Sequence, residues 1–278
     1  MEVVTSRAEQ ENKNTMKRIL FLIISALFVI CGNADNNIPR IDYLPFKSGE
    51  SIQYDVYYHW GIIWKKAAQG TLLINDSRYN DKNALKSSLA CRTLAFADKI
   101  LKVRDTLNSI TTTNIKPLYY EKIANEGNYR ATDILKYIYI QNSDSVGGDI
   151  TLIRKKRDPS NDTVWTTGTP YDMLSVFYFL RTVEYRALDL NSSFDIPIFT
   201  GRKVITMRVT YIGRTIVELK NKSFHESYRI NLNFLNDDNL KDEDPPIDVW
   251  LSSDNRRIPL KVEGKLPIGS LQAEYAGN

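Results

Sequence analysis

Short runs of alternating apolar and polar residues recur along most of this chain, separated by Asn, Gly, Pro or Asp. In the first run, Ile52, Tyr54 and Val56 share one face of an extended strand. A period of two residues is typical of a half-buried β-strand. Many such runs at regular spacing predict a mostly β fold, a strongly curved antiparallel sheet or an incomplete β-barrel. The predicted strands cover residues 51–58, 63–74, 85–95, 104–112, 118–124, 132–141, 149–155, 193–199, 204–211, 215–219, 228–235, 248–251, 258–263 and 270–275.

One segment departs from this pattern and predicts the main α-helix, at about residues 170–187. Thr169 suits the N-cap, Pro170 the first helical position and Asp172 the first turn. Residues 176–179 form an unbroken apolar and aromatic run, so the helix is expected to be covered on more than one side, packed on the concave side of the sheet. Apolar residues then recur at spacings of three and four: Met173, Leu174, Phe177, Leu180 and Val183.

The N-terminal segment predicts a secretion signal. A positively charged start at 16–18 precedes residues 19–30, which are apolar apart from one serine. Twelve helical residues span roughly 18 Å, less than the ~30 Å hydrocarbon core of a membrane. This pattern indicates an N-terminal extension and signal peptide over residues 1–34, cleaved near Ala34. The expected location is therefore the periplasm.

The two cysteines bear on the state of the exported chain. Lipid anchoring at Cys31 is the alternative to simple cleavage, and Ile30 disfavours it because a small residue is wanted there. Residues 35–278 are expected to form a single β-rich domain, which two sub-lobes could make up. No transmembrane span is expected in the mature chain. Cys91 is then the only cysteine left, so no intramolecular disulfide is expected. A net charge of +4 gives no strong field for holding nucleic acid.

The residue types that perform catalysis or bind metals are scarce. His59 and His225 have no second ligand at metal-binding spacing, and no Gly-x-Ser-x-Gly elbow is present. The acidic stretch at 237–244 lacks the EF-hand calcium pattern and predicts a solvated loop. Cys91 lies inside a predicted strand, where a lone cysteine is usually a small buried hydrophobe. We therefore expect no catalytic residue, no metal site and no cofactor, although carboxylates that pair through space leave glycoside hydrolysis open.

Aromatic residues supply the candidates for ligand binding. The chain has 16 Tyr, 10 Phe and 4 Trp, a composition that favours strands. Such side chains either line a groove for a sugar or lipid or pack within the faces of a sheet. The weak candidates for a ligand site are Tyr58, Trp60, Trp64, Phe177 and Tyr178.

Three phrases of the sequence carry a family resemblance. They are residues 46–50 with 54–58 and 60–61, residues 172–175 with Tyr178 and Arg181, and residues 249–251 with Asp254 and 257–260. In that order they resemble the bacterial domain of unknown function numbered 3108, seen in exported proteins of Bacteroides-type and proteobacterial species. The resemblance covers about residues 45–275 and implies a β-rich periplasmic protein with no established reaction. It carries over no catalytic residue.

The charged residues of these phrases have a structural interpretation. Asp172 and Arg181 are nine positions apart, so they do not pair along the helix. Each is expected to anchor the helix to the sheet, with Asp172 also complementing the helix N-terminus. Asp254 and Arg257 flank a predicted turn.

Function is predicted from export, architecture and the missing catalytic motifs. A curved sheet that closes partly around an apolar interior can hold one hydrophobic ligand, a shape similar to the periplasmic lipoprotein-localisation carriers. The leading hypothesis is a non-enzymatic periplasmic binding or carrier protein for a lipid-like or other apolar molecule, and it would fail if the interior of the sheet proved to be filled by side chains with no cavity. One alternative is a structural or interaction module that contacts an envelope protein during envelope assembly. A hydrolase of envelope glycans or esters is less favoured.

Overall fold

The structure is a computed structural model that describes residues 38–61, 63–235, 245–266 and 269–278. The predicted signal peptide, Cys31 and the acidic stretch at 237–244 lie outside these ranges, so expectations about them stay predictions. None of the helices in the described part of the chain has the length and apolar character that a membrane span requires.

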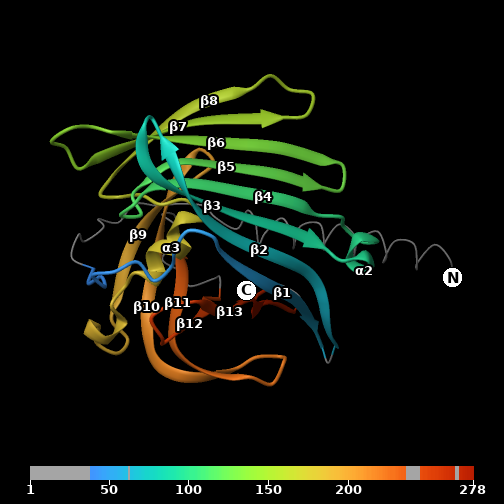
Figure 1. The fold of residues 1–278 in the computed structure, drawn as a ribbon. Helices are drawn as coiled ribbons and strands as arrows, with labels where there is room; N and C mark the ends of the chain where they lie inside the picture. The colour runs from blue at the N-terminus through green and yellow to red at the C-terminus, as the bar shows by residue number, and fades with distance from the viewer. Residues whose placement is uncertain (1–37, 62, 236–244, 267–268) are drawn as a thin grey trace.

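Fourteen strands form one sheet in which each strand pairs antiparallel with its neighbours (Figure 1). The order runs from β8 back to β1 and then from β14 back to β9, because β1 (Glu50–Trp60) pairs with β14 (Ser270–Gly277). The edge strands are β8 (Ser160–Thr167) and β9 (Ser193–Thr200). The other strands are β2 (Ile63–Tyr79), β3 (Lys82–Thr93), β4 (Arg104–Thr112), β5 (Pro117–Glu126), β6 (Tyr129–Tyr139), β7 (Ser145–Arg154), β10 (Lys203–Glu218), β11 (Phe224–Leu235), β12 (Ile247–Ser252) and β13 (Pro259–Lys265).

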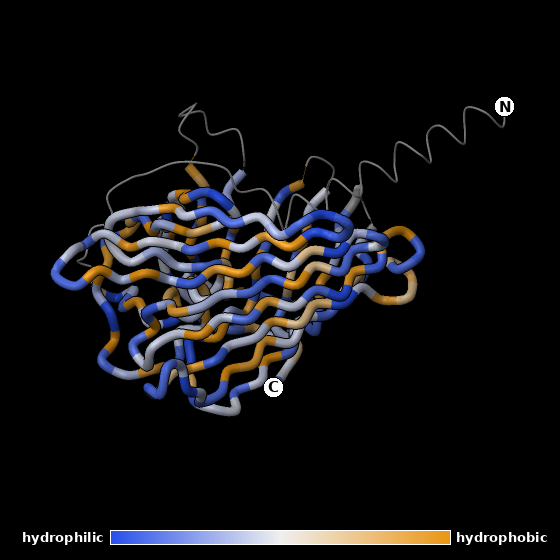
Figure 2. Tube along the Cα trace, turned by 90° about the horizontal axis from the view of Figure 1, so that it is seen from above, coloured by the Kyte–Doolittle hydropathy of each residue, from blue (hydrophilic) through white to orange (hydrophobic). Residues whose placement is uncertain are grey.

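The two edge strands nearly meet, which makes the sheet a nearly closed barrel. Arg202, in the turn after β9, donates a hydrogen bond to the Ser160 hydroxyl of β8 at 2.7 Å. Apolar and polar residues alternate along the strands in Figure 2, as expected for a sheet with one face toward a core. The predicted fold class, a mostly β incomplete barrel with one main helix, is confirmed.

The helix is shorter than the predicted 170–187 span. Helix α3 covers only Ser175–Arg181, and a single 3₁₀ turn follows at Tyr185–Ala187. The expected cap at Thr169 is wrong. The chain is still extended at Tyr171, which forms a parallel bridge with Ile198 of β9.

Asp172 starts the helix instead of Thr169. Its carboxylate accepts the backbone N–H groups of Leu174 and Ser175 at 2.9 and 2.8 Å. The Ser175 hydroxyl in turn accepts the Asp172 backbone N–H at 3.0 Å, which makes a reciprocal capping box. The same carboxylate accepts hydrogen bonds from Ser109 in β4 and Tyr137 in β6. The expected anchoring of the helix to the sheet by Asp172 is therefore confirmed.

Several strands differ from the sequence prediction; for example, β2 continues to Tyr79 instead of ending at 74, and β11 starts at Phe224 instead of 228. The pattern missed β8, because most of its residues are polar and exposed and show no apolar face. The segments predicted at 204–211 and 215–219 are one strand, β10. It continues through Gly213, whose φ of 127° accompanies a shift in the pairing with β11. The short helix α2 (Ala95–Asp98) joins β3 to β4.

The space around α3 is a packed core. Leu174, Phe179 and Leu180 are each at most 4% exposed and lie in one cluster with side chains of the surrounding strands. The described interior around α3 is therefore filled by side chains, which goes against the predicted ligand cavity inside the curved sheet. Members of this cluster from β9 to β12 are Ile196, Ile198, Phe199, Ile205, Met207, Val209, Tyr211, Val217, Tyr228, Ile230, Leu232, Val249 and Leu251.

Candidate functional site

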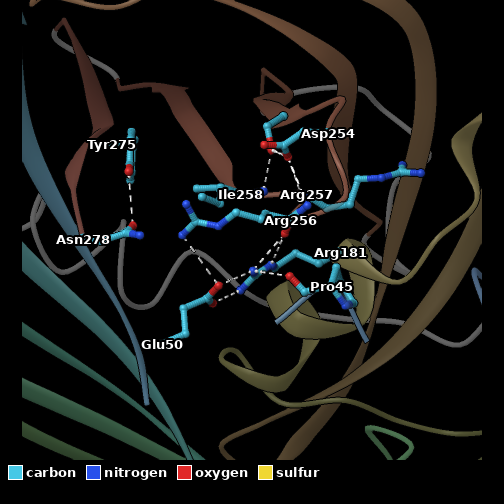
Figure 3. Close-up of polar contacts among 10 residues, drawn as sticks. Pro45, Glu50, Arg181, Asp254, Arg256, Arg257, Ile258, Tyr275 and Asn278 are labelled. Atoms are coloured by element: carbon cyan, nitrogen blue, oxygen red, sulfur yellow. Dashed lines mark hydrogen bonds and ion pairs between the residues drawn. The ribbon is translucent and has the colours of Figure 1, made fainter. Parts of the chain in front are cut away.

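Three segments far apart in the sequence meet at the last residue of α3 (Figure 3). The Arg181 side chain is fully buried, and its guanidinium donates two hydrogen bonds to the Glu50 carboxylate, at 2.6 and 3.0 Å. It also donates to the backbone oxygen of Arg256, at 2.9 and 3.3 Å, and to that of Pro45, at 3.2 Å. Arg181 therefore joins the end of α3 to two other segments. One is the β12–β13 turn, and the other is the start of β1 together with residues 43–49 before it, which we call the lead-in segment. This is what the predicted anchoring role requires.

Burial and aromatic rings isolate this ion pair from solvent. The Glu50 side chain is 8% exposed. The guanidinium lies over the ring of Phe46, 4.9 Å from its centroid, and near the ring of Tyr178 at 5.6 Å. These two rings meet edge to face at 5.0 Å. Because the charges compensate each other, the pair positions the lead-in segment and is not itself free to bind an ion.

The turn between β12 and β13 presents Arg256 to the pair. The Asp254 carboxylate accepts hydrogen bonds from the Ser252 hydroxyl at 2.6 Å and from the backbone N–H groups of Arg256 and Arg257 at 3.1 and 3.3 Å. The Ser252 hydroxyl accepts the Ile258 N–H at 2.8 Å. The turn predicted between Asp254 and Arg257 is confirmed, and both residues are architectural.

A surface cavity of about 830 Å³, open to solvent, adjoins this cluster. Ligand-binding cavities typically enclose about 300–1,000 Å³, so it has room for a small molecule. Tyr43 and Leu44 are each 41% exposed, while Phe46 is buried. The residues lining the cavity are Tyr43, Leu44, Pro45, Phe46, Lys47, Ser48, Gly49, Glu50, Ser51, Asn255, Arg256 and Asn278.

The charges around the cavity favour an anionic ligand group. Glu50 is neutralised by Arg181, whereas Arg256 is 43% exposed and only reaches Glu50 at 4.0 Å. Lys47 is exposed in the same lining. Among the uncharged polar residues of the lining is Asn278, which accepts a hydrogen bond from the Tyr275 hydroxyl at 3.1 Å (Figure 3). The site therefore combines apolar surface with two cations available to solvent.

The sequence candidates from α3 lie behind this cavity. Tyr178 is 2% exposed and packs against Phe46, one of the lining residues. Phe177 is half-buried against the core. Neither lines the cavity.

Of the candidates from β1 and β2, Tyr58 and Trp64 lie outside the cavity lining as well. Trp64 is 40% exposed and stacks on the ring of His59, with centroids 4.0 Å apart. Tyr58 is half-buried in β1, and Trp60 is the last residue of that strand. Tyr58, Trp64, Phe177 and Tyr178 are therefore not brought together at the cavity, and a ligand-binding role for all five candidates stays a prediction.

A second group of titratable residues lies on the sheet face that looks toward α3. Asp105 is on the same face of β4 as Ser109, which contacts α3, and it is 3% exposed. Burial and the neighbouring Asp105 raise the pKa of Glu126 to about 7. Burial also raises the pKa of the Cys91 thiol, opposite Asp105, to about 11. The Glu126 carboxyl thus holds a proton more readily than usual, whereas the Cys91 thiol is a poor nucleophile. Among the described residues, no group of three or more His, Cys, Asp or Glu could hold a metal ion.

Residues 53–275 match the family described as protein of unknown function DUF3108. The chain belongs to the DUF3108 family. No curated protein matches this DUF3108 chain at a significant level. Its fold is similar to the crystal structure of a beta-barrel-like protein of domain of unknown function DUF1849 from Brucella abortus, with a TM-score of 0.50 and 10% sequence identity. That likeness covers 83% of this chain and 96% of the other, and at this identity it shows the fold alone.

The cavity residues of this DUF3108 chain were missed by sequence reasoning for a physical reason. The lead-in at residues 43–49 has no apolar period, so nothing in it indicated a structured wall. Its position depends on hydrogen bonds from Arg181, 136 residues away from Pro45. The available signal was the phrase at 46–50, which supplies five of the twelve lining residues and ends at Glu50.

Proposed function

We propose that this DUF3108 chain is a non-enzymatic binding protein of the cell envelope that holds a small amphiphilic molecule in the cavity beside Glu50. The cavity itself is the observation that carries the proposal, since it has ligand-sized volume, apolar walls and solvent-available cations. The ligand class is a lipid-like molecule with one anionic group.

The arrangement of charges supports an anionic end on the ligand. Arg181 already compensates Glu50, so the cavity floor adds no net negative charge. The guanidinium of Arg256 and the ammonium of Lys47 then remain to pair with a carboxylate or phosphate. Charge-assisted hydrogen bonds of this kind are about twice as strong as neutral ones. The apolar part of the ligand would contact Tyr43 and Leu44.

Export to the periplasm belongs to the same proposal. The signal-peptide pattern of residues 1–34 supports it. A carrier in that compartment would need a way to cover apolar surface, and Tyr43 and Leu44 would cover part of a bound ligand.

Displacement of a dansylated C11 fatty acid tests the proposal. Arg256→Gln is expected to weaken binding of this carboxylate probe about ten-fold, because one charge-assisted contact is lost. Binding of the corresponding fatty alcohol should change less than two-fold. Arg229→Gln is the matched control, since Arg229 is 40% exposed and lies on β11 outside the cavity lining. Failure of the wild-type chain to bind either probe, or equal losses in both variants, would overturn the proposal.

An interaction module is the second candidate function. In the described sheet β8 pairs only with β7. Arg202 contacts β8 near its start, at Ser160 and Asp162, so the later part of the strand is the edge at which another chain could add a strand. Trp165 on β8 is 47% exposed and lies across Gly147, where an added Cβ would come within 2.9 Å of its ring. Size-exclusion chromatography with light scattering tests this candidate, which predicts an oligomer or complex that Trp165→Ser abolishes. A monomer that captures no partner in both forms would count against it.

A further inference from the structure

One end of the barrel gathers basic side chains. Consecutive strands run antiparallel, so the connections after β1, β3, β5 and β7 lie at the same end, on the right of Figure 1. These connections carry five basic and two acidic residues: Lys99, Lys102, Lys155, Lys156 and Arg157 with Asp98 and Asp158. The connections after β2, β4 and β6 lie at the opposite end and carry one basic and two acidic residues: Lys116 with Asp81 and Asp144.

The turn between β10 and β11 lies against the same end. The Lys220 ammonium is 3.5 Å from the ring centroid of Trp64 in β2, and the Lys220 backbone N–H donates to Glu274 in β14 at 2.7 Å. Lys222 in this turn is also exposed and pairs with Glu218 at 3.2 Å. We call these turns, with residues 64–66 and 94–102, the basic end.

Exposed rings accompany the lysines of the basic end. Trp64 is 40% exposed, Phe96 is 44% exposed and Phe224 is 67% exposed. The Lys65 ammonium lies 3.6 Å from the ring centroid of Phe96. The rings of Phe96 and Trp64 therefore each stand next to a lysine while keeping an open surface, and Phe224 is the most exposed of the three rings. Aromatic and basic side chains in this combination are typical of protein surfaces that lie in the headgroup region of a membrane.

We propose that the basic end docks on an anionic membrane surface, with its lysines at the lipid headgroups and the rings of Trp64, Phe96 and Phe224 in the interfacial layer. The positive charge of the lysines complements anionic headgroups, and the exposed rings suit the interfacial layer; both features favour a membrane as the partner. A nucleic acid or an acidic protein surface would pair with the lysines but would not give all three exposed rings an apolar environment. The inference goes beyond the proposed ligand site, because no residue of the cavity takes part.

Binding to vesicles tests the electrostatic half of the proposal. The purified chain is expected to bind vesicles of 70% phosphatidylcholine and 30% phosphatidylglycerol and to bind pure phosphatidylcholine far more weakly. Each lysine at an anionic surface contributes roughly a five-fold change in partition. The double variant Lys65→Gln with Lys220→Gln should therefore lose about 25-fold in partition.

The opposite end of the barrel supplies a matched control. Lys82→Gln with Lys116→Gln makes the same change of charge at exposed residues, and the Lys116 ammonium also lies over a ring, that of Tyr139 at 3.8 Å. This pair is expected to change partition by less than two-fold. Equal losses in the two double variants would mean unoriented attraction and would overturn the proposal, as would failure of the wild-type chain to bind anionic vesicles.

A ring substitution tests the interfacial half and separates a membrane from a soluble polyanion. Phe224→Ser should lower vesicle partition roughly five-fold at both low and high salt, since about half of a phenyl side chain leaves an apolar contact. Ile140→Ser is its control, because Ile140 is 47% exposed in the connection after β6. Binding of polyglutamate with vesicle-like affinity, or vesicle binding that is indifferent to Phe224→Ser, would show that the partner is not a membrane.

Discussion

The substitution Glu50→Gln tests whether the buried ion pair holds the lead-in segment against the barrel. Glutamine keeps the length of the side chain and removes its charge, whereas Arg181 stays protonated. Arg181 has no exposed surface and Glu50 is only 8% exposed, so water cannot replace the missing carboxylate without local opening.

The expected loss of stability is set by the geometry of the pair. Two charge-assisted hydrogen bonds join the groups, at 2.6 and 3.0 Å. The amide oxygen of glutamine can keep one, while its NH₂ group would face another donor. Losing one such bond costs about 1.5–3 kcal/mol, and leaving a buried charge without its partner brings the total to about 3–5 kcal/mol. At a urea m-value of about 3 kcal/mol/M the midpoint should fall by roughly 1–2 M.

Urea unfolding followed by tryptophan fluorescence measures this shift. Asp195→Asn is the matched control, because Arg208 binds Asp195 through the same two-bond geometry, at 2.8 and 2.9 Å, but is 46% exposed. Exposed pairs contribute less than about 1 kcal/mol, so the control should hardly move the midpoint. Similar small shifts for both variants would refute the argument that burial makes the Glu50 pair a structural anchor.

Three further outcomes are expected. The free energy of unfolding should fall by up to roughly 3 kcal/mol as pH rises from about 4.5 to about 7. Burial raises the folded-state pKa of Glu126 to about 7, so the folded chain binds this proton more tightly than the unfolded chain does. Glu126→Gln should flatten that slope in urea midpoints measured across this pH range. Gly148→Ala should cost about 1–3 kcal/mol by the same assay, since the new Cβ would lie 2.7 Å from a Leu135 methyl group, and an unchanged midpoint would show that Leu135 yields freely. Cys91 should react with a disulfide reagent near pH 8 on the order of 100-fold more slowly than a model thiol, because burial raises its pKa to about 11, and urea should restore the rate.

Local pattern predicted the fold class because alternation is a property of neighbouring residues. It failed at β8, where an exposed edge strand has no apolar face to produce the pattern. Barrel closure was equally hidden, since β1 pairs with β14 across more than 200 residues, as in His59 with Ser270. The helix was predicted to start too early because Thr169 and Pro170 have the residue types of a helix start, yet the backbone of Tyr171 still pairs with β9.

The candidate site was predictable only in part. Arg181 was expected to anchor the helix, and it does, but its carboxylate partner lies 131 positions away. The aromatic candidates were chosen by residue type, and type alone cannot separate Tyr178, which fills the core, from Trp64, which faces solvent. The cavity depends on a non-periodic lead-in held by tertiary hydrogen bonds, which leave no local signal in the sequence.

Native mass spectrometry of residues 35–278, purified without detergent, tests the central claim that the cavity holds a ligand. The wild-type chain is expected to carry an additional mass that extracts into organic solvent. Leu44→Glu should abolish it by placing a charge in the apolar wall, whereas Leu190→Glu, at a site 66% exposed and outside the cavity lining, should keep it. A wild-type chain that shows only its own mass, even after incubation with the C11 probe, or an additional mass that survives Leu44→Glu, would contradict the account.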